Sequence, residues 1–224
     1  MLALARTGAE EALWLSAARQ TQGRGRQGRA WSSPAGNVSA STLVRLRPSD
    51  PPAPTLALVA AVSVGDVVGT FLRSAPGGSD GLAIKWPNDL LLHGAKLAGI
   101  LLERADDAIV IGIGVNLAQH PALSDRPTTS LAAHDVGVDP AVFVETLAEA
   151  FARWLQRWRW EGLAPIRDRW LAMAHPIGTA LTARLPDGQA IDALFDGLDH
   201  DGALILRLAG GERRVIHAGD VFLI

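Results

Sequence analysis

The sequence contains no cysteine, and this absence excludes several kinds of site at once. Without thiols the chain can form no disulfide framework, no thiolate nucleophile and no cysteine-based metal site. The six histidines show no helical pair with the spacing of metal ligands, so we expect no zinc site either. Other side chains must therefore carry whatever chemistry the protein performs.

Long uninterrupted hydrophobic runs are also missing. The most apolar stretch, residues 56–72, is interrupted by Asp66 and by two glycines. The N-terminus lacks the basic region, the apolar stretch and the cleavage site of a signal peptide. These absences predict a cytoplasmic protein with no membrane partner.

Acidic residues are absent from one long part of the chain. The formal net charge is −2, which argues against a protein whose whole surface is built to hold nucleic acid. Residues 12–49, by contrast, contain six arginines and no Asp or Glu. Positive charge is therefore concentrated toward one end of the chain, and an anionic ligand is expected there.

The residues that are present predict one large and one small domain. The 224 residues are 48% hydrophobic, which is enough for a substantial core. Up to residue 174 the apolar spacing predicts strands at 13–18, 38–46, 82–86, 90–93, 96–103 and 108–117, and helices at 55–72 and from 140 onward. From residue 175 it predicts five short strands, at 179–185, 189–198, 203–208, 213–217 and 221–224. Such spacing is typical of a small β-barrel.

Residues 20–31 read QTQGRGRQGRAW and form a loop between two predicted strands. Glycines let the backbone turn its N–H groups toward a ligand, and arginines offer forked donors that match carboxylate or phosphate oxygens. The segment therefore predicts an anion clamp. The alternative is a solvated loop or an RNA-binding segment, but the flanking strands and the single short copy favour the clamp. Because its arginines repel one another, we expect the clamp to be mobile without a ligand.

Two further segments place lysines in apolar surroundings, KWPND at residues 85–89 and KLAGI at residues 96–100. A buried ammonium group is costly unless it is paired. Each lysine therefore either has an anionic partner or packs its stem on apolar surface while its head reaches solvent. A fourth segment, GIGVN at residues 112–116, ends a strand with glycines that permit close approach and with an amide that can bind a base edge.

In this order the four segments resemble the biotin protein ligases, and with the C-terminal barrel the resemblance covers essentially the whole chain. It implies an α+β fold, with a mixed-sheet catalytic domain of the biotin/lipoate ligase type at residues 1–174 and a small SH3-like β-barrel at residues 175–224. It also implies the reaction. Biotin and ATP give biotinyl-5′-AMP and pyrophosphate, with Mg²⁺ as cofactor, and the biotinyl group then passes to a lysine of a biotin carboxyl carrier domain of acetyl-CoA carboxylase or a related enzyme.

The resemblance also implies roles for individual residues. The implied catalytic residues are Lys96, Arg26 and Lys85. The residues implied to bind biotin are Gln20, Gly23, Arg24, Gly25, Arg26, Trp31, Lys96, Gly99 and Ile100. The residues implied to bind ATP are Arg26, Arg29, Lys85, Asn88, Asp89 and Asn116, and Asp89 is also the implied Mg²⁺ ligand.

Two other functions remain open at this point. A lipoate or octanoate ligase would share the fold and the adenylation chemistry, although the clamp followed by KWPND favours biotin. A non-catalytic nucleic-acid-binding module would use the arginines to grip RNA or DNA. Some family members repress transcription through an N-terminal helix-turn-helix domain, but here the clamp begins about twenty residues from Met1 and leaves no room for one, so no DNA partner is expected. Monomers and homodimers both occur in the family.

One family feature is missing from this sequence. Family members have a strand that ends in Ser-Thr or Ser-Thr-Asn shortly before the first helix, and its hydroxyls bind the ureido ring of biotin. This chain instead opens with MLALAR, which resembles the helix that follows that strand. We therefore expect a catalytic domain that lacks its first strand, as in a chain shortened at its N-terminus.

Overall fold

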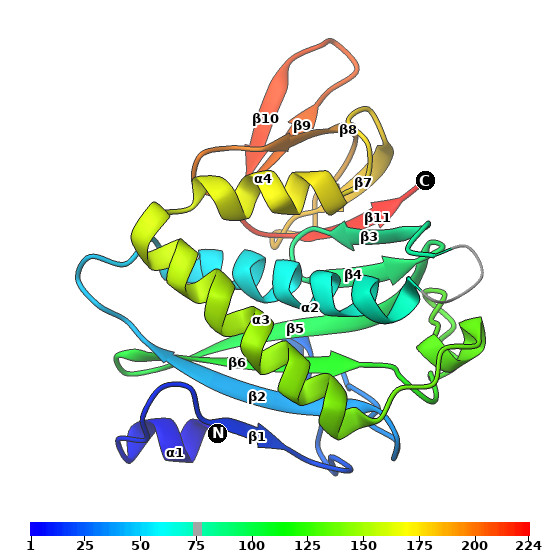
Figure 1. The fold of residues 1–224 in the computed structure, drawn as a ribbon. Coiled ribbons are helices and arrows are strands. Elements are labelled where there is room, and N and C mark those ends of the chain that lie inside the picture. Colours follow the sequence, from blue (N-terminus) through cyan, green and yellow to red (C-terminus); the bar gives the residue numbers. More distant parts are fainter. Residues whose placement is uncertain (74–77) are drawn as a thin grey trace.

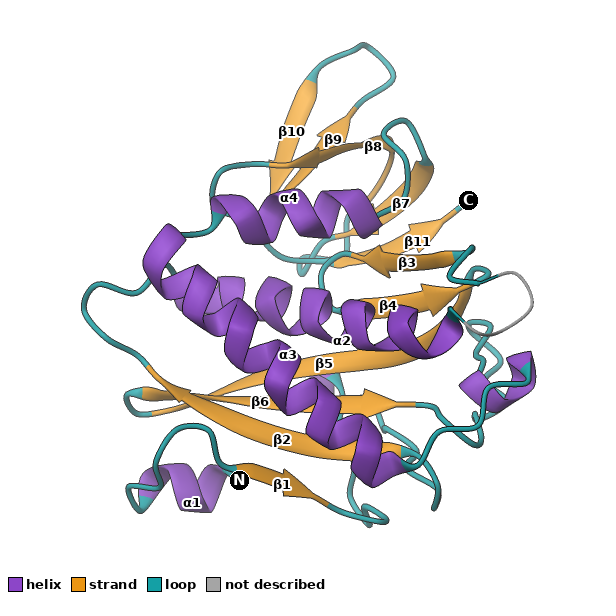
Figure 2. Ribbon diagram, viewed as in Figure 1, coloured by secondary structure: helices purple, strands orange, loops and turns teal. Residues whose placement is uncertain are grey.

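The computed structural model describes residues 1–73 and 78–224, which form a large sheet covered by helices and a smaller sheet beside it (Figure 1). The large sheet has the strand order β1-β2-β6-β5-β4-β3. Its strands along the chain are β1 (Trp14–Ser16), β2 (Val38–Arg45), β3 (Leu82–Lys85), β4 (Asp89–Leu92), β5 (Ala95–Ala105) and β6 (Ala108–Val115). The long helices α2 (Leu56–Leu72) and α3 (Pro140–Glu161) cover one face of it (Figure 2).

The ladders of the large sheet are antiparallel. The predicted α+β fold is confirmed, but in this detail the structure differs from the predicted mixed sheet. Within residues 1–73 and 78–224, parallel pairing is limited to two isolated bridges, Ile84 with Ala174 and Lys96 with Thr128. Connectivity is the reason, because short turns join β3, β4, β5 and β6 in succession, and short turns join only antiparallel strands.

Helix α2 is the central element of the core. Residues Ala53–Leu72 have the length and hydropathy of a membrane span, yet 72% of this apolar stretch is buried within the protein, as in the core helix of a folded domain. Its one acidic residue, Asp66, accepts a hydrogen bond from the Trp154 indole of α3 at 2.8 Å. Asp66 also pairs with Arg169 of α4 (Ala164–Met173) at 2.5 Å. One carboxylate therefore ties three helices together.

Helix α3 begins where the sequence predicts. The carboxylate of Asp139 accepts hydrogen bonds from the N–H groups of Ala141 and Val142, at 2.7 and 3.3 Å, and Pro140 occupies the first helical position. The buried side of α3 includes Phe143, Leu147, Phe151 and Trp158. This side packs against α2, and the two helices thus form a single layer on the sheet.

After α4 the chain forms a second antiparallel sheet, in the order β10-β9-β8-β7-β11. Its strands are β7 (Ala180–Arg184), β8 (Ala190–Leu198), β9 (Leu204–Arg207), β10 (Arg213–Ile216) and β11 (Asp220–Leu223), at the five predicted places. The hydrophobic core is continuous between the two units. Trp170 of α4 packs on Phe195 of β8 with a ring separation of 6.3 Å, and the Trp86 indole donates to the carbonyl of Gly202 at 3.3 Å. The smaller sheet thus lies against the β3 end of the large unit (Figure 1).

The N-terminal residues form the short helix α1 (Leu2–Arg6), and β1 is left as the edge strand of the large sheet. Ala5 of α1 packs against Ala105 and Ala108 near the turn between β5 and β6. Helix α1 therefore covers one end of the sheet, beside the cavity described below.

Thr55 gives a test of the core. Its hydroxyl accepts the indole N–H of Trp158 at 2.8 Å, and both residues are buried. The substitution Thr55→Val keeps the shape but leaves that N–H unpaired, so we expect the free energy of unfolding in urea to fall by about 1–3 kcal/mol. Thr70→Val, at an exposed position of α2, is the control and should change it by less than about 0.5 kcal/mol. Equal losses in the two variants would contradict this account.

Candidate functional site

Three charged side chains meet where β3, β4 and β5 lie next to each other. Asp89 at the start of β4 pairs with Lys85 across the hairpin that joins β3 to β4, and Lys96 comes from β5. One carboxylate oxygen of Asp89 accepts from Nζ of Lys96 at 2.5 Å, and the other lies 3.2 Å from Nζ of Lys85. Lys85 also donates to the carbonyl of Val221, at 2.8 Å. Asp89 is thus the anionic partner that the two lysines needed.

Burial and charge act on this group in opposite directions. Burial alone would raise the pKa of the Asp89 carboxyl, but the ammonium groups of Lys96 and Lys85 outweigh it and hold that pKa below its usual value. Burial lowers the pKa of Lys85, and the Asp89 carboxylate offsets part of this effect. Because two amines share one carboxylate, the group offers positive charge to its surroundings.

The glycine-arginine segment forms a tight loop held by its own backbone. Arg24 and Ala30 form an antiparallel bridge, and the N–H of Gly25 donates to the carbonyl of Arg29 at 2.7 Å. The N–H of Trp31 closes the loop by donating to the carbonyl of Gly23 at 2.9 Å. These bonds bring both ends of the loop together.

Residues from the smaller sheet anchor this loop. Arg26 donates to the carboxylate of Asp220 at 3.2 Å and to the carbonyl of Gly219 at 3.1 Å. Arg29 pairs with the second oxygen of the same carboxylate. Repulsion among the arginines was the reason to predict a mobile loop, and Asp220 relieves that repulsion in this structure.

Trp31 explains the glycines of two motifs. Its indole lies against Gly99 of β5 and Gly114 of β6, and a Cβ atom built on Gly114 would collide with the ring. The ammonium group of Lys96 lies 5.6 Å from the centre of the same ring, within range of a cation–π interaction. The close approach predicted for the GIGVN glycines is therefore made by a side chain of the protein itself.

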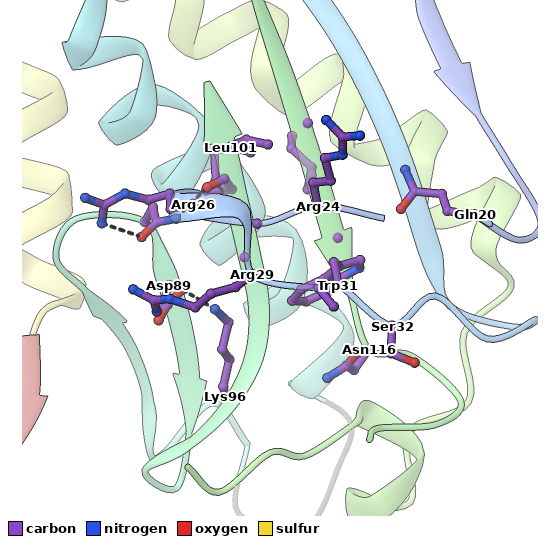
Figure 3. Close-up of a pocket in the computed structure, with 18 of the residues that line it drawn as sticks. Gln20, Arg24, Arg26, Arg29, Trp31, Ser32, Asp89, Lys96, Leu101 and Asn116 are labelled. Atoms are coloured by element: carbon purple, nitrogen blue, oxygen red, sulfur yellow. Dashed lines mark hydrogen bonds and ion pairs between the residues drawn. The ribbon is translucent and has the colours of Figure 1, made fainter. Parts of the chain in front are cut away.

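A cavity of about 870 Å³ lies between this loop and strands β5 and β6 (Figure 3). It extends along β5 from Lys96 to Glu103, and its far end is lined by Met1, Leu2 and Val110. This volume is within the usual range for a small-molecule site. Thirteen of the fourteen predicted site residues line it, namely Gln20, Arg24, Gly25, Arg26, Arg29, Trp31, Lys85, Asn88, Asp89, Lys96, Gly99, Ile100 and Asn116.

Comparisons with known proteins identify the family. The profile of the Biotin/lipoate A/B protein ligase family matches residues 6–116, and that of the Biotin protein ligase C terminal domain matches residues 177–224. A biotin–[acetyl-CoA-carboxylase] ligase of Paracoccus denitrificans is 42% identical over 93% of this chain and 89% of its own. A Mycobacterium tuberculosis protein of the same name is 36% identical over 99% of this chain and 83% of its own. The chain belongs to the biotin protein ligase family.

The fold agrees with this assignment. A biotin protein ligase from Aquifex aeolicus, solved in complex with biotin and ATP, superposes with a TM-score of 0.86. The superposition covers 99% of this chain and 94% of that one, at 22% sequence identity. The chain described here therefore has the same two-unit fold as the Aquifex aeolicus ligase.

Gly23 is the one predicted site residue of this ligase that is not among the described residues lining the cavity. A Cβ atom at this position would collide with the carbonyl oxygen of Trp31, and its own carbonyl accepts the N–H of Trp31. Gly23 is therefore needed to close the loop, and no direct contact with a ligand in the cavity is indicated.

The predicted Mg²⁺ ligand does not fit the geometry of this ligase. Both carboxylate oxygens of Asp89 are taken by ammonium groups, and a further cation beside Lys85 and Lys96 would be repelled. In the part of the chain that the structure describes, no three His, Asp or Glu side chains are grouped to hold a metal ion. Mg²⁺ commonly binds through substrate phosphates with few protein ligands, so phosphates would have to supply most of its ligands here.

Two residues of the site were missed in the sequence. Asp220 lines the cavity and holds both Arg26 and Arg29, yet it is a lone acidic residue in a short strand of the other unit. Asn37 is buried beside Asn116, and its side chain accepts a hydrogen bond from the backbone N–H of Leu117, the residue after Asn116. Neither residue belongs to a motif. Asn37 is revealed only as a buried polar group, and Asp220 only by its pairing with Arg26 and Arg29, and both signals need the structure.

The low pKa of Asp89 predicts a pH-dependent contribution to stability. A carboxylate whose pKa is depressed on folding stabilises the protein above its unfolded pKa of about 4, and this contribution is lost as the pH falls through the folded value. We expect Asp89→Asn to lower the free energy of unfolding at pH 7 by about 3 kcal/mol, because it removes the anion from a buried pair. The difference from wild type should shrink below about pH 4 in urea titrations. A difference that stayed constant down to the acid transition would contradict the assignment.

The packing of Trp31 gives a second test. Gly114→Ala should push the indole away from β6 and lower the free energy of unfolding by about 1–3 kcal/mol through overpacking. Trypsin should then cleave the loop after Arg24, Arg26 or Arg29 faster than in wild type, because the loop is no longer held by Trp31. Gly112→Ala on the same strand is the control, since its added Cβ would come no closer than 3.7 Å to other atoms. Equal cleavage of the two variants would show that Trp31 does not hold the loop.

Proposed function

We propose that this protein is an ATP-dependent biotin protein ligase, which forms biotinyl-5′-AMP from biotin and ATP and passes the biotinyl group to a lysine of a biotin carboxyl carrier domain. One observation carries the proposal. A single cavity brings together residues of all four motif segments, with the Lys85, Asp89 and Lys96 group at one end and apolar side chains at the other. The names of the two bacterial relatives support biotin as the substrate.

The first step brings two anions together. An oxygen of the biotin carboxylate attacks the α-phosphate, and the bond from the α-phosphorus to the bridging oxygen of the β-phosphate breaks, so that pyrophosphate leaves. The carboxylate is already ionised at neutral pH, and no general base is needed. The protein must therefore position the two reactants and stabilise negative charge on the phosphate.

We assign the central charge to Lys96. Its ammonium group is fixed by Asp89 and lies where the charged end of the cavity meets the part bounded by Trp31. In this position it neutralises the biotin carboxylate and the α-phosphate together. We assign Lys85 and Arg26 to the remaining phosphates, and their place in the lining of the cavity supports this assignment.

The apolar part of the cavity suits the apolar chain and the thioether side of the ring of biotin. Gly99, Ile100 and Trp31 line its side, and we assign them to the biotin ring and chain. Asn116 lines the cavity from the end of β6, and its amide can pair with the adenine edge. Bound Mg²⁺ would offset negative charge on the phosphates of ATP, which would have to supply most of its ligands.

In the second step the carrier lysine attacks the acyl carbon of the mixed anhydride, the bond from that carbon to the phosphate oxygen breaks, and AMP leaves. The amine must lose a proton to form the amide, and bulk water that reaches the lysine at the mouth of the cavity takes up this proton. The lowered pKa of Asp89 makes that carboxylate a poor acceptor for the proton. The open side of the cavity leaves the anhydride accessible to an incoming lysine side chain.

The direct test is incubation of the protein with biotin, ATP, Mg²⁺ and a purified biotin carboxyl carrier domain, followed by detection of protein-bound biotin. We expect labelling of the carrier that requires ATP, and biotin-dependent exchange of pyrophosphate into ATP. Faster exchange with lipoate than with biotin would instead assign a lipoate or octanoate ligase. Salt-sensitive nucleic-acid binding without any exchange would favour a binding module.

Lys96→Gln tests the assignment of the central charge. It removes the charge but keeps a side chain of similar length, and it should slow biotinyl-5′-AMP formation at least about 10²–10³-fold. Asp89 keeps its pair with Lys85, so circular dichroism should show a folded protein. Arg213→Gln, at an exposed position of the smaller sheet, is the control and should leave the rate unchanged. Near-normal exchange by folded Lys96→Gln protein would refute the role of Lys96.

A further inference from the structure

Asn37 lies just before β2, and its side chain organises the backbone that follows β6. It is 5% exposed. Its Oδ1 accepts hydrogen bonds from three consecutive N–H groups, those of Leu117, Ala118 and Gln119, at 3.1, 3.0 and 3.1 Å. Three donors on one oxygen fix the path of the chain directly after Asn116.

The other end of the Asn37 amide points at Asn116. Its Nδ2 donates to the carbonyl of Gln119 at 2.8 Å and approaches Oδ1 of Asn116 at 3.4 Å. Nδ2 of Asn116 in turn donates to the carbonyl of Thr129 at 3.0 Å. Both ends of the Asn116 amide therefore have fixed partners, and its oxygen and nitrogen cannot exchange places without losing both bonds.

An amide held in this way still has one lone pair and one N–H free. These match one edge of adenine, where the amino group donates a hydrogen bond and the neighbouring ring nitrogen accepts one. Hypoxanthine presents a carbonyl oxygen in place of the amino group, and that oxygen would face the oxygen of the amide. Orientation of the Asn116 amide is thus a means of distinguishing ATP from ITP.

We propose that Asn37 is a positioning residue that sets the orientation of the Asn116 amide and thereby the preference for an adenine nucleotide. The inference rests on the proposed use of ATP. Asn37 is not among the described residues lining the cavity, so it acts through Asn116 and does not touch the nucleotide.

The chemistry of the Asn37 side chain allows its two tasks to be separated. Asn37→Asp keeps an oxygen that accepts from the three N–H groups, and three N–H groups can stabilise a carboxylate. It removes the donor to Asn116 and places a second oxygen against Oδ1 of Asn116. That repulsion favours the reversed amide. The carbonyl of Gln119 also loses its donor in this variant. The three bonds from the N–H groups of Leu117, Ala118 and Gln119 hold the turn, while the orientation of Asn116 is lost.

The test compares biotin-dependent pyrophosphate exchange with ATP and with ITP. Wild-type protein should prefer ATP, and Asn37→Asp should reduce the ratio of kcat/KM for ATP to that for ITP by about tenfold, the effect of one hydrogen bond. The KM for ATP should rise while the KM for biotin stays unchanged. Asn37→Ser, whose hydroxyl is too short to reach Asn116, frees the Asn116 amide without reversing it, and it should reduce the ratio in the same direction by less than tenfold if the Asp variant does not fold.

Gln119→Ala is the matched control. Its side chain is exposed, and only its backbone contacts Asn37, so the preference for ATP should be that of wild type. A parallel loss of activity with ATP and ITP, or an unchanged ratio in both Asn37 variants, would overturn the inference while leaving the proposed function in place. Absence of biotin-dependent exchange in the wild-type protein would overturn the proposed function and this inference with it.

Discussion

The pairing of one buried carboxylate with two ammonium groups is the interaction on which the site depends. Asp89 allows Lys85 and Lys96 to lie close together in a place where each alone would be costly to bury. Because a single negative charge serves two amines, positive charge remains and faces the cavity. The same arrangement explains why the carboxylate is unsuited to hold a metal ion or to take up a proton. The sheet, the loop and the smaller unit then shape the space around this charge.

Local pattern was enough to predict most of the fold. The alternating and helical spacing of apolar residues predicted the strands of both sheets and helices α2 and α3. A strand or helix that is buried on one face repeats its apolar residues with its own structural period. The sequence also predicted that the two lysines need a partner or a route to solvent. It did not show that Asp89 is this partner, since the pairing depends on strand register, and Asp89 was assigned to Mg²⁺ instead. The separate helix α4 and the purely antiparallel pairing of the large sheet were likewise not predicted.

Contacts between distant segments could not be predicted. The glycines at 99 and 114 were recognised as sites of close approach, but nothing in the sequence identified Trp31 as the group that approaches them. Asp220 and Asn37 carry polar contacts across 194 and 80 positions of the chain, and no periodicity links residues so far apart. Such residues follow from the folded geometry, in which every buried polar group must find a partner.

The anchoring of the loop by β11 has a consequence for the order in which the site is assembled. The Lys85, Asp89 and Lys96 group is formed by neighbouring hairpins, whose contacts are local and quick to close. The bond between Arg26 and Asp220 joins residues 194 positions apart, so it carries a larger cost in chain entropy and must wait until β11 has been synthesised. A growing chain would therefore bring Lys85, Asp89 and Lys96 together before it can fix the loop beside them. Completion of the smaller sheet becomes the step that turns a charged surface into a cavity.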